Sequence, residues 1–271
     1  MKRAPLLIAA CAALAVLAWM PAARAQDASG KQDRLSLSAA GHTLTNTNGG
    51  WGASALWLHN FSDSTLFGLG AESQTIGEAR WTFGKLNFNH GFGESLERTN
   101  VYFDAAVGSG HDNQHDYDYL IGTVGVFRSL TRQLTLQFED KQINVDTSHG
   151  NLPKLGLQYL WNPRFSTSLA YAYSVSGSLD TKLAMARVDG YTKTMNLFAG
   201  IANGQAAPIV TGLAPGTPVP GFILHQYYVG VGRTFSRADG TAVLDYVRLG
   251  TSNHWTLTFS AMLHQRTAAP P

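Results

Sequence analysis

Cysteine is nearly absent from this sequence. The single cysteine, Cys11, lies within an apolar N-terminal segment that we expect to be removed during export. The mature chain would then hold no thiol, which excludes disulfide bonds, thiolate metal ligands and cysteine nucleophiles. The fold must therefore be held together by packing and hydrogen bonds.

Charged side chains are also scarce. Asp, Glu, Lys and Arg make up 14% of the chain, against about 25% in ordinary soluble domains. Loss of Lys2, Arg3 and Arg24 with the N-terminal segment would leave 17 of the 20 basic residues against 18 acidic ones, a net charge of −1. A near-neutral chain without a basic patch gives no indication of nucleic-acid binding.

Long apolar runs are missing except at the N-terminus. Basic residues precede an uncharged apolar stretch over 6–19, and Ala23-Arg24-Ala25 places small residues at both positions that a signal peptidase reads. We therefore predict that residues 1–25 are a signal peptide, cleaved after Ala25. The alternatives are a membrane anchor, for which the run is short against a span of about 20 residues, and lipidation of Cys11.

Helical periodicity is missing beyond residue 25, where apolar residues alternate with small polar ones. Between 165 and 175, for example, Leu169 and Tyr171 fall on one face of an extended chain, and Ser168 and Ala170 on the other. Such alternation indicates strands that face two environments. Twelve strands is the alternative, because the pattern is weakest at 34–44 and 182–202. The fourteen strands that we predict are 34–44, 51–60, 65–74, 79–88, 100–109, 117–128, 133–144, 153–162, 165–176, 182–189, 192–202, 223–235, 241–249 and 254–264.

The connections between these strands indicate a membrane barrel. Short links such as 61–64 alternate with longer polar ones such as 110–116, 146–151 and 202–221, and 91–99 is the exception to this order. Outer-membrane barrels have short turns at one end and longer loops at the other. An even strand count places both termini on the short-turn, periplasmic side.

Closure follows from the physics of a sheet in lipid. Backbone polar groups there must be satisfied within the sheet, and only a closed barrel achieves this. A soluble β-sandwich is the alternative, but it would carry more surface Lys and Glu and shorter loops. We predict an all-β protein in which residues 26–264 form a single closed antiparallel transmembrane β-barrel of the outer membrane, followed by a polar tail at 265–271.

Tryptophan and tyrosine residues gather near the ends of the predicted strands. Aromatic rings with a polar tip collect at the membrane interface and form girdles there. The residues that we expect in these girdles are Trp51, Trp57, Trp81, Trp161, Trp255, Tyr117, Tyr119 and Tyr246.

Six charged residues fall on or near the small-polar face of the strands. A charge that faces lipid at mid-depth costs about 2–4 kcal/mol for Arg or Lys, so these side chains should face the lumen. Their signs nearly balance, and we expect Glu139 and Lys141 to cancel against Arg80 and Asp104, which disfavours strong ion selectivity. The candidate pore-lining residues are Glu72, Arg80, Asp104, Glu139, Lys141 and Asp245.

Two polar segments carry residue types that are used in catalysis or metal binding. Residues 108–118 include two histidines and three aspartates, but their spacing matches no metal signature and a solvated loop accounts for them. Ser148, His149 and Asn151 are the residue types of a phospholipase triad, yet neighbours in sequence cannot converge as a triad requires. We therefore predict no catalytic residue, no metal site and no cofactor.

A proline-rich loop is expected at the mouth of the barrel. It begins at Gln205 and includes Pro208, Pro215 and Pro218. Such a loop either folds over the mouth, where it would narrow a pore, or stays exposed to solvent. The sequence leaves both possibilities open.

The chain resembles the YaiO-like outer-membrane barrels of Gram-negative bacteria. The resemblance rests on 66–72 (LFGLGAE), 102–104 (YFD), 151–161 (NLPKLGLQYLW) and 168–173 (SLAYAY). It implies a barrel that contacts outer-membrane lipid, lipopolysaccharide and the barrel insertion machinery, is sometimes associated with exopolysaccharide-export components, and lends no catalytic residue. One departure is the tail that continues past Leu263, where such barrels end in an aromatic residue.

Three functions are compatible with these features. The predicted one is a passive or export-linked channel with weak ion selectivity, and not an enzyme. The alternatives are a barrel hydrolase acting on lipid or peptide, which needs Ser, His and Asp groups that converge at the outer rim, and a plugged structural or adhesive barrel.

Overall fold

The structure, a computed structural model, describes most of the chain after residue 32. The described residues are 33–45, 49–77, 79–93, 98–111, 116–145, 148–177, 180–206, 222–235 and 238–264. The predicted signal peptide and the tail lie outside them, so both stay predictions. Within the described residues there is no helix long and apolar enough to cross a membrane.

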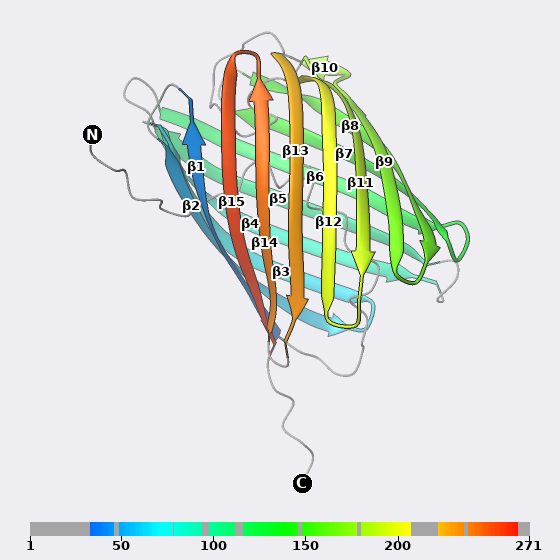
Figure 1. The fold of residues 1–271 in the computed structure, drawn as a ribbon. Coiled ribbons are helices and arrows are strands. Elements are labelled where there is room, and N and C mark those ends of the chain that lie inside the picture. Colours follow the sequence, from blue (N-terminus) through cyan, green and yellow to red (C-terminus); the bar gives the residue numbers. More distant parts are fainter. Residues whose placement is uncertain are drawn as a thin grey trace.

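Long antiparallel strands account for nearly all of the described chain (Figure 1). They are β1 (Asp33–Leu44), β2 (Gly50–Ser62), β3 (Thr65–Ile76), β4 (Ala79–Phe92), β5 (Thr99–His111), β6 (Asp116–Ser129), β7 (Leu134–Val145), β8 (Ser148–Asn162), β9 (Phe165–Tyr173), β11 (Lys182–Tyr191), β12 (Met195–Ala206), β13 (Phe222–Thr234), β14 (Ala238–Leu249) and β15 (Ser252–His264), with the two-residue β10 (Ser176–Gly177) beside β8.

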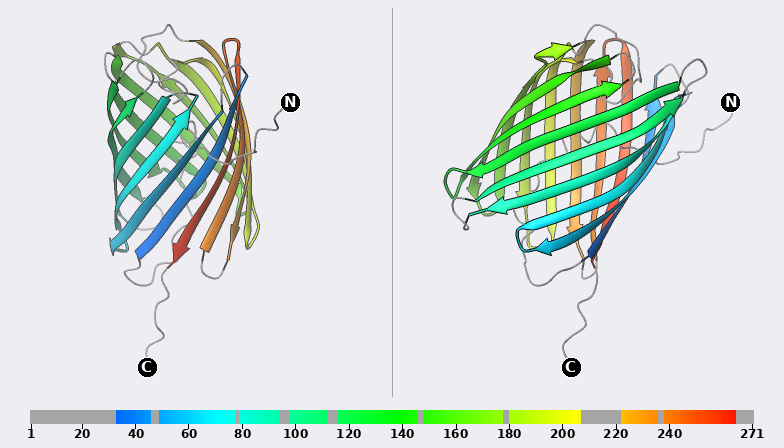
Figure 2. Two further views of the ribbon diagram at one scale, coloured as in Figure 1. Left: turned by 90° about the vertical axis from the view of Figure 1, so that its left-hand side faces the viewer. Right: turned by 180° about the vertical axis from the view of Figure 1, so that it is seen from behind.

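These strands close into a single barrel. Each long strand pairs with the next one along the chain, and β1 pairs with β15 from Arg34 opposite His264 to Leu44 opposite His254. Figure 2 shows the wall from two further sides. The predicted closed 14-strand antiparallel barrel is confirmed, and the twelve-strand alternative is wrong.

Strand boundaries differ from the predictions mainly in β8. This strand begins at Ser148, so the predicted polar link over 146–151 shrinks to the two residues 146–147. The prediction began this strand at Pro153. In the barrel Pro153 lies within the ladder, opposite Asp140, and the strand extends for five residues before it.

The two ends of the barrel differ in their connections. We call the end where β1 begins and β15 finishes the terminal end, and the opposite one the distal end. At the terminal end, Asn162 Oδ1 accepts a hydrogen bond of 2.8 Å from the backbone N–H of Arg164, a turn that Pro163 favours by fixing its φ angle. The distal end carries the longest connection, 207–221, and also tight turns such as the one that begins at Gly250 (φ 59°).

Side chains alternate between an inner row, which faces the lumen, and an outer row. On β9, Leu169 is 62% exposed whereas its neighbour Ser168 is 1% exposed. The large exposed side chains of the wall belong mostly to the outer row and are apolar, such as Val107 and Val229. This apolar outer face is the surface that a barrel presents to lipid.

Candidate functional site

The inner row is the candidate site, and it holds five of the six predicted pore-lining residues: Glu72, Asp104, Glu139, Lys141 and Asp245.

Arg80 is the exception, since it lies on the outer row of β4 beside the buried Trp81. Its assignment to the lumen was wrong because the cost of a lipid-facing charge applies at mid-depth and nearly vanishes at the interface. Arg80 is the second residue of its strand, at the distal end.

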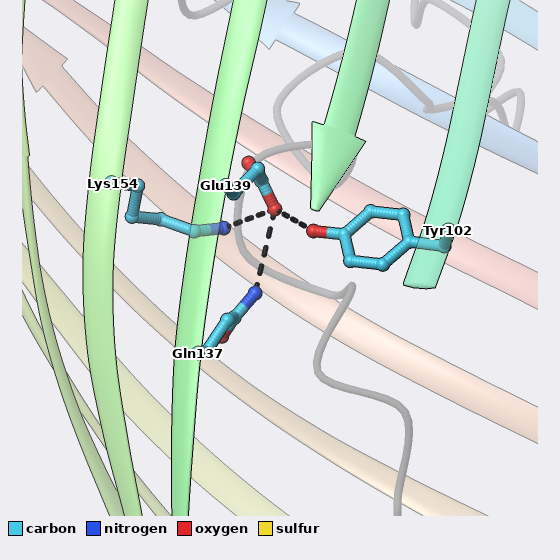
Figure 3. A network of polar contacts seen from close by, with 4 residues as sticks. All are labelled: Tyr102, Gln137, Glu139 and Lys154. Carbon is cyan, nitrogen blue, oxygen red and sulfur yellow. Dashed lines mark hydrogen bonds and ion pairs between the residues drawn. The ribbon is translucent and has the colours of Figure 1, made fainter. Parts of the chain in front are cut away.

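Glu139 is the centre of a buried polar network (Figure 3). Its Oε2 accepts hydrogen bonds from Lys154 Nζ at 2.8 Å, the Tyr102 hydroxyl at 2.5 Å and Gln137 Nε2 at 3.4 Å. The expected cancellation against Arg80 is therefore wrong, and the ion-pair partner is Lys154. Lys154 was not among the predicted pore-lining residues, although its alternation with Leu155 and Leu157 places it on the inner row. That it pairs with Glu139 depends on the register between β7 and β8.

Other inner-row charges also have polar partners. Lys85 pairs with Glu72, and Asn87 donates a hydrogen bond to Asp104. With further pairs on β11 to β14, ion pairs cancel part of the charge on this wall, whereas neutral amide partners satisfy a carboxylate by hydrogen bonding without cancelling its charge. The further pairs are Arg187 Nη2 with Asp189 Oδ1 at 2.6 Å and Gln226 Nε2 with Asp245 Oδ2 at 3.0 Å.

An apolar belt lines the distal half of the lumen. Its side chains come from inner-row positions near the distal ends of their strands, are at most 9% exposed, and form one contact cluster. The members of the belt are Ile76, Trp81, Phe83, Tyr117, Tyr119, Ile143, Val145, Leu152, Ala172, Leu183, Met185, Ala202, Ala206, Leu224, Val247 and Leu249.

The belt corrects part of the predicted aromatic girdles. Trp81, Tyr117 and Tyr119 lie near strand ends as expected but point into the lumen, where the rings of Trp81 and Tyr119 are 6.5 Å apart and Phe83 meets Tyr119 edge-on at 5.1 Å. Their position along the strand was right and the face was wrong, because a strand end alone does not fix which row a ring joins.

The remaining girdle residues lie on the outer row. Trp51, Trp57, Trp161 and Trp255 are each at least 40% exposed, and Tyr246 packs against Trp255 in a tilted arrangement with ring centroids 4.7 Å apart. Trp51 and Trp255 lie toward the distal end and Trp57 and Trp161 toward the terminal end, which matches two interfacial girdles.

A polar seam runs along the inner row where β15, β1 and β2 meet, and its distal part, with His42 and Thr256, lies between the belt residues of β3 and β14. It carries hydroxyl and imidazole groups in place of large apolar side chains, and Ser38 Oγ contacts Ser54 Oγ at 2.7 Å within it. The seam residues are Ser36, Ser38, His42, Ser54, Thr256, Thr258 and Ser260.

Several buried inner-row polar atoms have no hydrogen-bond partner among the described residues. They include Oγ of Ser166 and Ser168, Oγ1 of Thr258, and both amide atoms of Gln74. Buried polar groups are rarely left without a partner, which makes these atoms unusual within this wall.

The predicted mouth loop and catalytic-type segments gain little support. Gln205 belongs to β12, where its Nε2 donates to Asp180 Oδ2 at 2.5 Å, while Pro208, Pro215 and Pro218 lie outside the described residues. The outer-row Asn151 hydrogen-bonds to Asp140. Within the described ranges, no group of three or more His, Cys, Asp or Glu side chains is placed to hold a metal ion.

Known proteins resemble this chain in structure and not in sequence. No family model and no curated protein matches it. The structure of the CymD monoaromatic hydrocarbon channel is similar with a TM-score of 0.62 and 12% identity, over 98% of this chain and 95% of that one. The toluene transporter TodX of Pseudomonas putida has a TM-score of 0.54 and 10% identity, over 89% of this chain and 90% of that one. A FadL homologue of Pseudomonas aeruginosa has a TM-score of 0.53 and 11% identity, over 86% of this chain and 90% of that one. At these identities the likeness establishes the fold alone, a closed antiparallel β-barrel.

Proposed function

We propose that the protein is an outer-membrane channel for small apolar or amphipathic solutes, including aromatic ones. The apolar belt carries this proposal. An apolar solute gains free energy when it leaves water for such a lining, by about 25 cal/mol per Å² of apolar surface, whereas an ion gains nothing there. The description of CymD and TodX as a hydrocarbon channel and a toluene transporter supports the same choice.

A transport role is favoured over an enzymatic one. Of the solved structures of similar fold named above, CymD is described as a channel and TodX as a transporter. The triad that a hydrolase needs would have to converge from different strands, and Asn151 bonds instead to Asp140 on the outer row.

A weakly ion-selective aqueous pore is the second candidate. The polar seam and the paired charges of the inner wall favour it, because balanced charges leave little field to select ions. The export link implied by the YaiO-like resemblance belongs to this candidate and stays a prediction. Single-channel recording distinguishes the two: open, weakly selective conductance supports the pore, and electrical silence together with solute binding supports the apolar channel.

Trp81 offers a direct test of solute binding in the belt. Of the described tryptophans it alone is on the inner row, since Trp51, Trp57, Trp161 and Trp255 face outward. In refolded protein, bromobenzene should quench the fluorescence of Trp81 saturably, measured as the difference between the wild type and Trp81→Phe. Lipids with brominated acyl chains should quench the outward tryptophans and leave this difference signal unchanged.

Competition then identifies the solute class. Toluene, which does not quench, should restore the Trp81 signal, whereas a neutral disaccharide should not. Quenching of Trp81 that never saturates, or equal competition by toluene and the sugar, would contradict an apolar binding belt.

A further inference from the structure

Two histidines stand at the gap in the apolar belt. His42 on β1 and His254 on β15 both lie on the inner row and are 6% and 4% exposed. His42 is opposite Thr256, and Leu44 is opposite His254, so the two histidines are diagonal neighbours across one strand pair. Diagonal neighbours on one face are about 7–8 Å apart, which two imidazole side chains can bridge through a shared ligand.

The hydrogen bonding of His42 leaves one ring nitrogen available. Its Nδ1 lies 3.1 Å from Thr256 Oγ1. If Nδ1–H donates to this hydroxyl, Nε2 becomes a bare acceptor, the arrangement by which proteins orient histidine toward a metal ion. Nε2 of His42 and Nδ1 of His254 are both buried and have no hydrogen-bond partner among the described residues.

We propose that His42 and His254 bind a divalent transition-metal ion in the distal half of the lumen. Imidazole nitrogen is a preferred ligand for zinc, nickel and copper ions. Gln74 is a further oxygen donor on the same wall: it is fully buried, its amide is unpartnered among the described residues, and only Gly52 separates it from β1. Water completes the coordination, as in sites that keep positions open.

Zinc titration of the refolded mature protein by calorimetry tests the site. The wild type should bind one zinc ion, and His42→Gln or His254→Gln should each weaken binding at least tenfold. The matched control is the double variant His111→Gln/His115→Gln, which removes two histidines from the distal loop region and should leave the affinity unchanged. Heat-modifiable migration on gels verifies that each variant is folded.

Copper provides a second measurement that does not depend on the variants. The electron paramagnetic resonance spectrum of the Cu²⁺-loaded wild type should show hyperfine coupling to two imidazole nitrogens. Absence of stoichiometric zinc binding, a copper spectrum without coupled nitrogens, or zinc binding lost only in the His111/His115 variant would each overturn the proposal.

Discussion

A matched pair of lysine substitutions on β6 tests the inner and outer rows at one depth. Val124 lies on the outer row in the middle of the strand and is 54% exposed. Its neighbour Thr123 lies on the inner row, between Asp104 on β5 and Lys141 on β7. We compare Val124→Lys with Thr123→Lys.

The expected difference follows from what each lysine meets. At position 124 the ammonium faces lipid near mid-depth, at a cost of about 2–4 kcal/mol. At position 123 the ammonium reaches the lumen beside the Asp104 carboxylate, which offsets the repulsion from Lys141. We therefore expect the free energy of unfolding to change by no more than about 1 kcal/mol. A net difference of about 2 kcal/mol changes the folding equilibrium by a factor of roughly 30.

Reversible unfolding by guanidinium in lipid vesicles measures this difference in stability. The readout is the loss of heat-modifiable migration on gels. Val124→Lys should shift the midpoint to lower denaturant while the slope stays constant. Equal destabilisation by the two substitutions, or a larger loss for Thr123→Lys, would refute the assignment of rows on β6 and with it the lumen described here.

Two further predictions concern the polar network and the processed N-terminus. Lys154→Met leaves the buried Glu139 carboxylate without its cation and should lower the free energy of unfolding by about 3 kcal/mol, measured by the same unfolding. Adding Glu139→Gln should recover part of this stability, whereas the control Lys182→Met, at the exposed start of β11, should lower stability little. A double variant no more stable than Lys154→Met alone would contradict the ion-pair account. The intact mass of exported protein should correspond to a chain that begins at Gln26, and a retained signal or a diacylglycerol on Cys11 would exclude that cleavage.

The fold was readable from the sequence because lipid and lumen impose opposite demands on alternate residues. On β9 four of the five alternate residues are large and largely apolar, with Thr167 the exception, so the strand and its faces both follow from the pattern. Leu169 and Ser168 illustrate this, with their exposures of 62% and 1%. The alternation is local, and no long-range contact is needed to see it.

The lumen was only partly readable, because its contents depend on register. That Glu139 faces inward follows from its own strand, but that Lys154 is its partner follows from the pairing of β7 with β8. The face of the sheet that Trp81 and Tyr119 occupy was predicted wrongly for a related reason, because an aromatic residue at a strand end suits either an interfacial girdle or an inner lining. Tracing the row from Trp81 to Phe83 and Lys85 would have separated the two.

The layered lumen restricts what can cross the barrel. An ion that enters from the distal end meets the apolar belt, where no polar group replaces its hydration. The path with the lowest desolvation cost is therefore the seam past His42 and Thr256. If the barrel is the channel proposed above, a purely apolar solute would gain free energy at the belt but would then meet the paired charges around Glu139, whose desolvation it would have to offset. A solute with an apolar body and one polar group satisfies both layers, because the body lies on the belt while the polar group follows the seam. Phenol should therefore compete for Trp81 more strongly than toluene at equal occupancy of the lipid phase, and a weaker effect of phenol would show that the seam and the belt do not act on one solute.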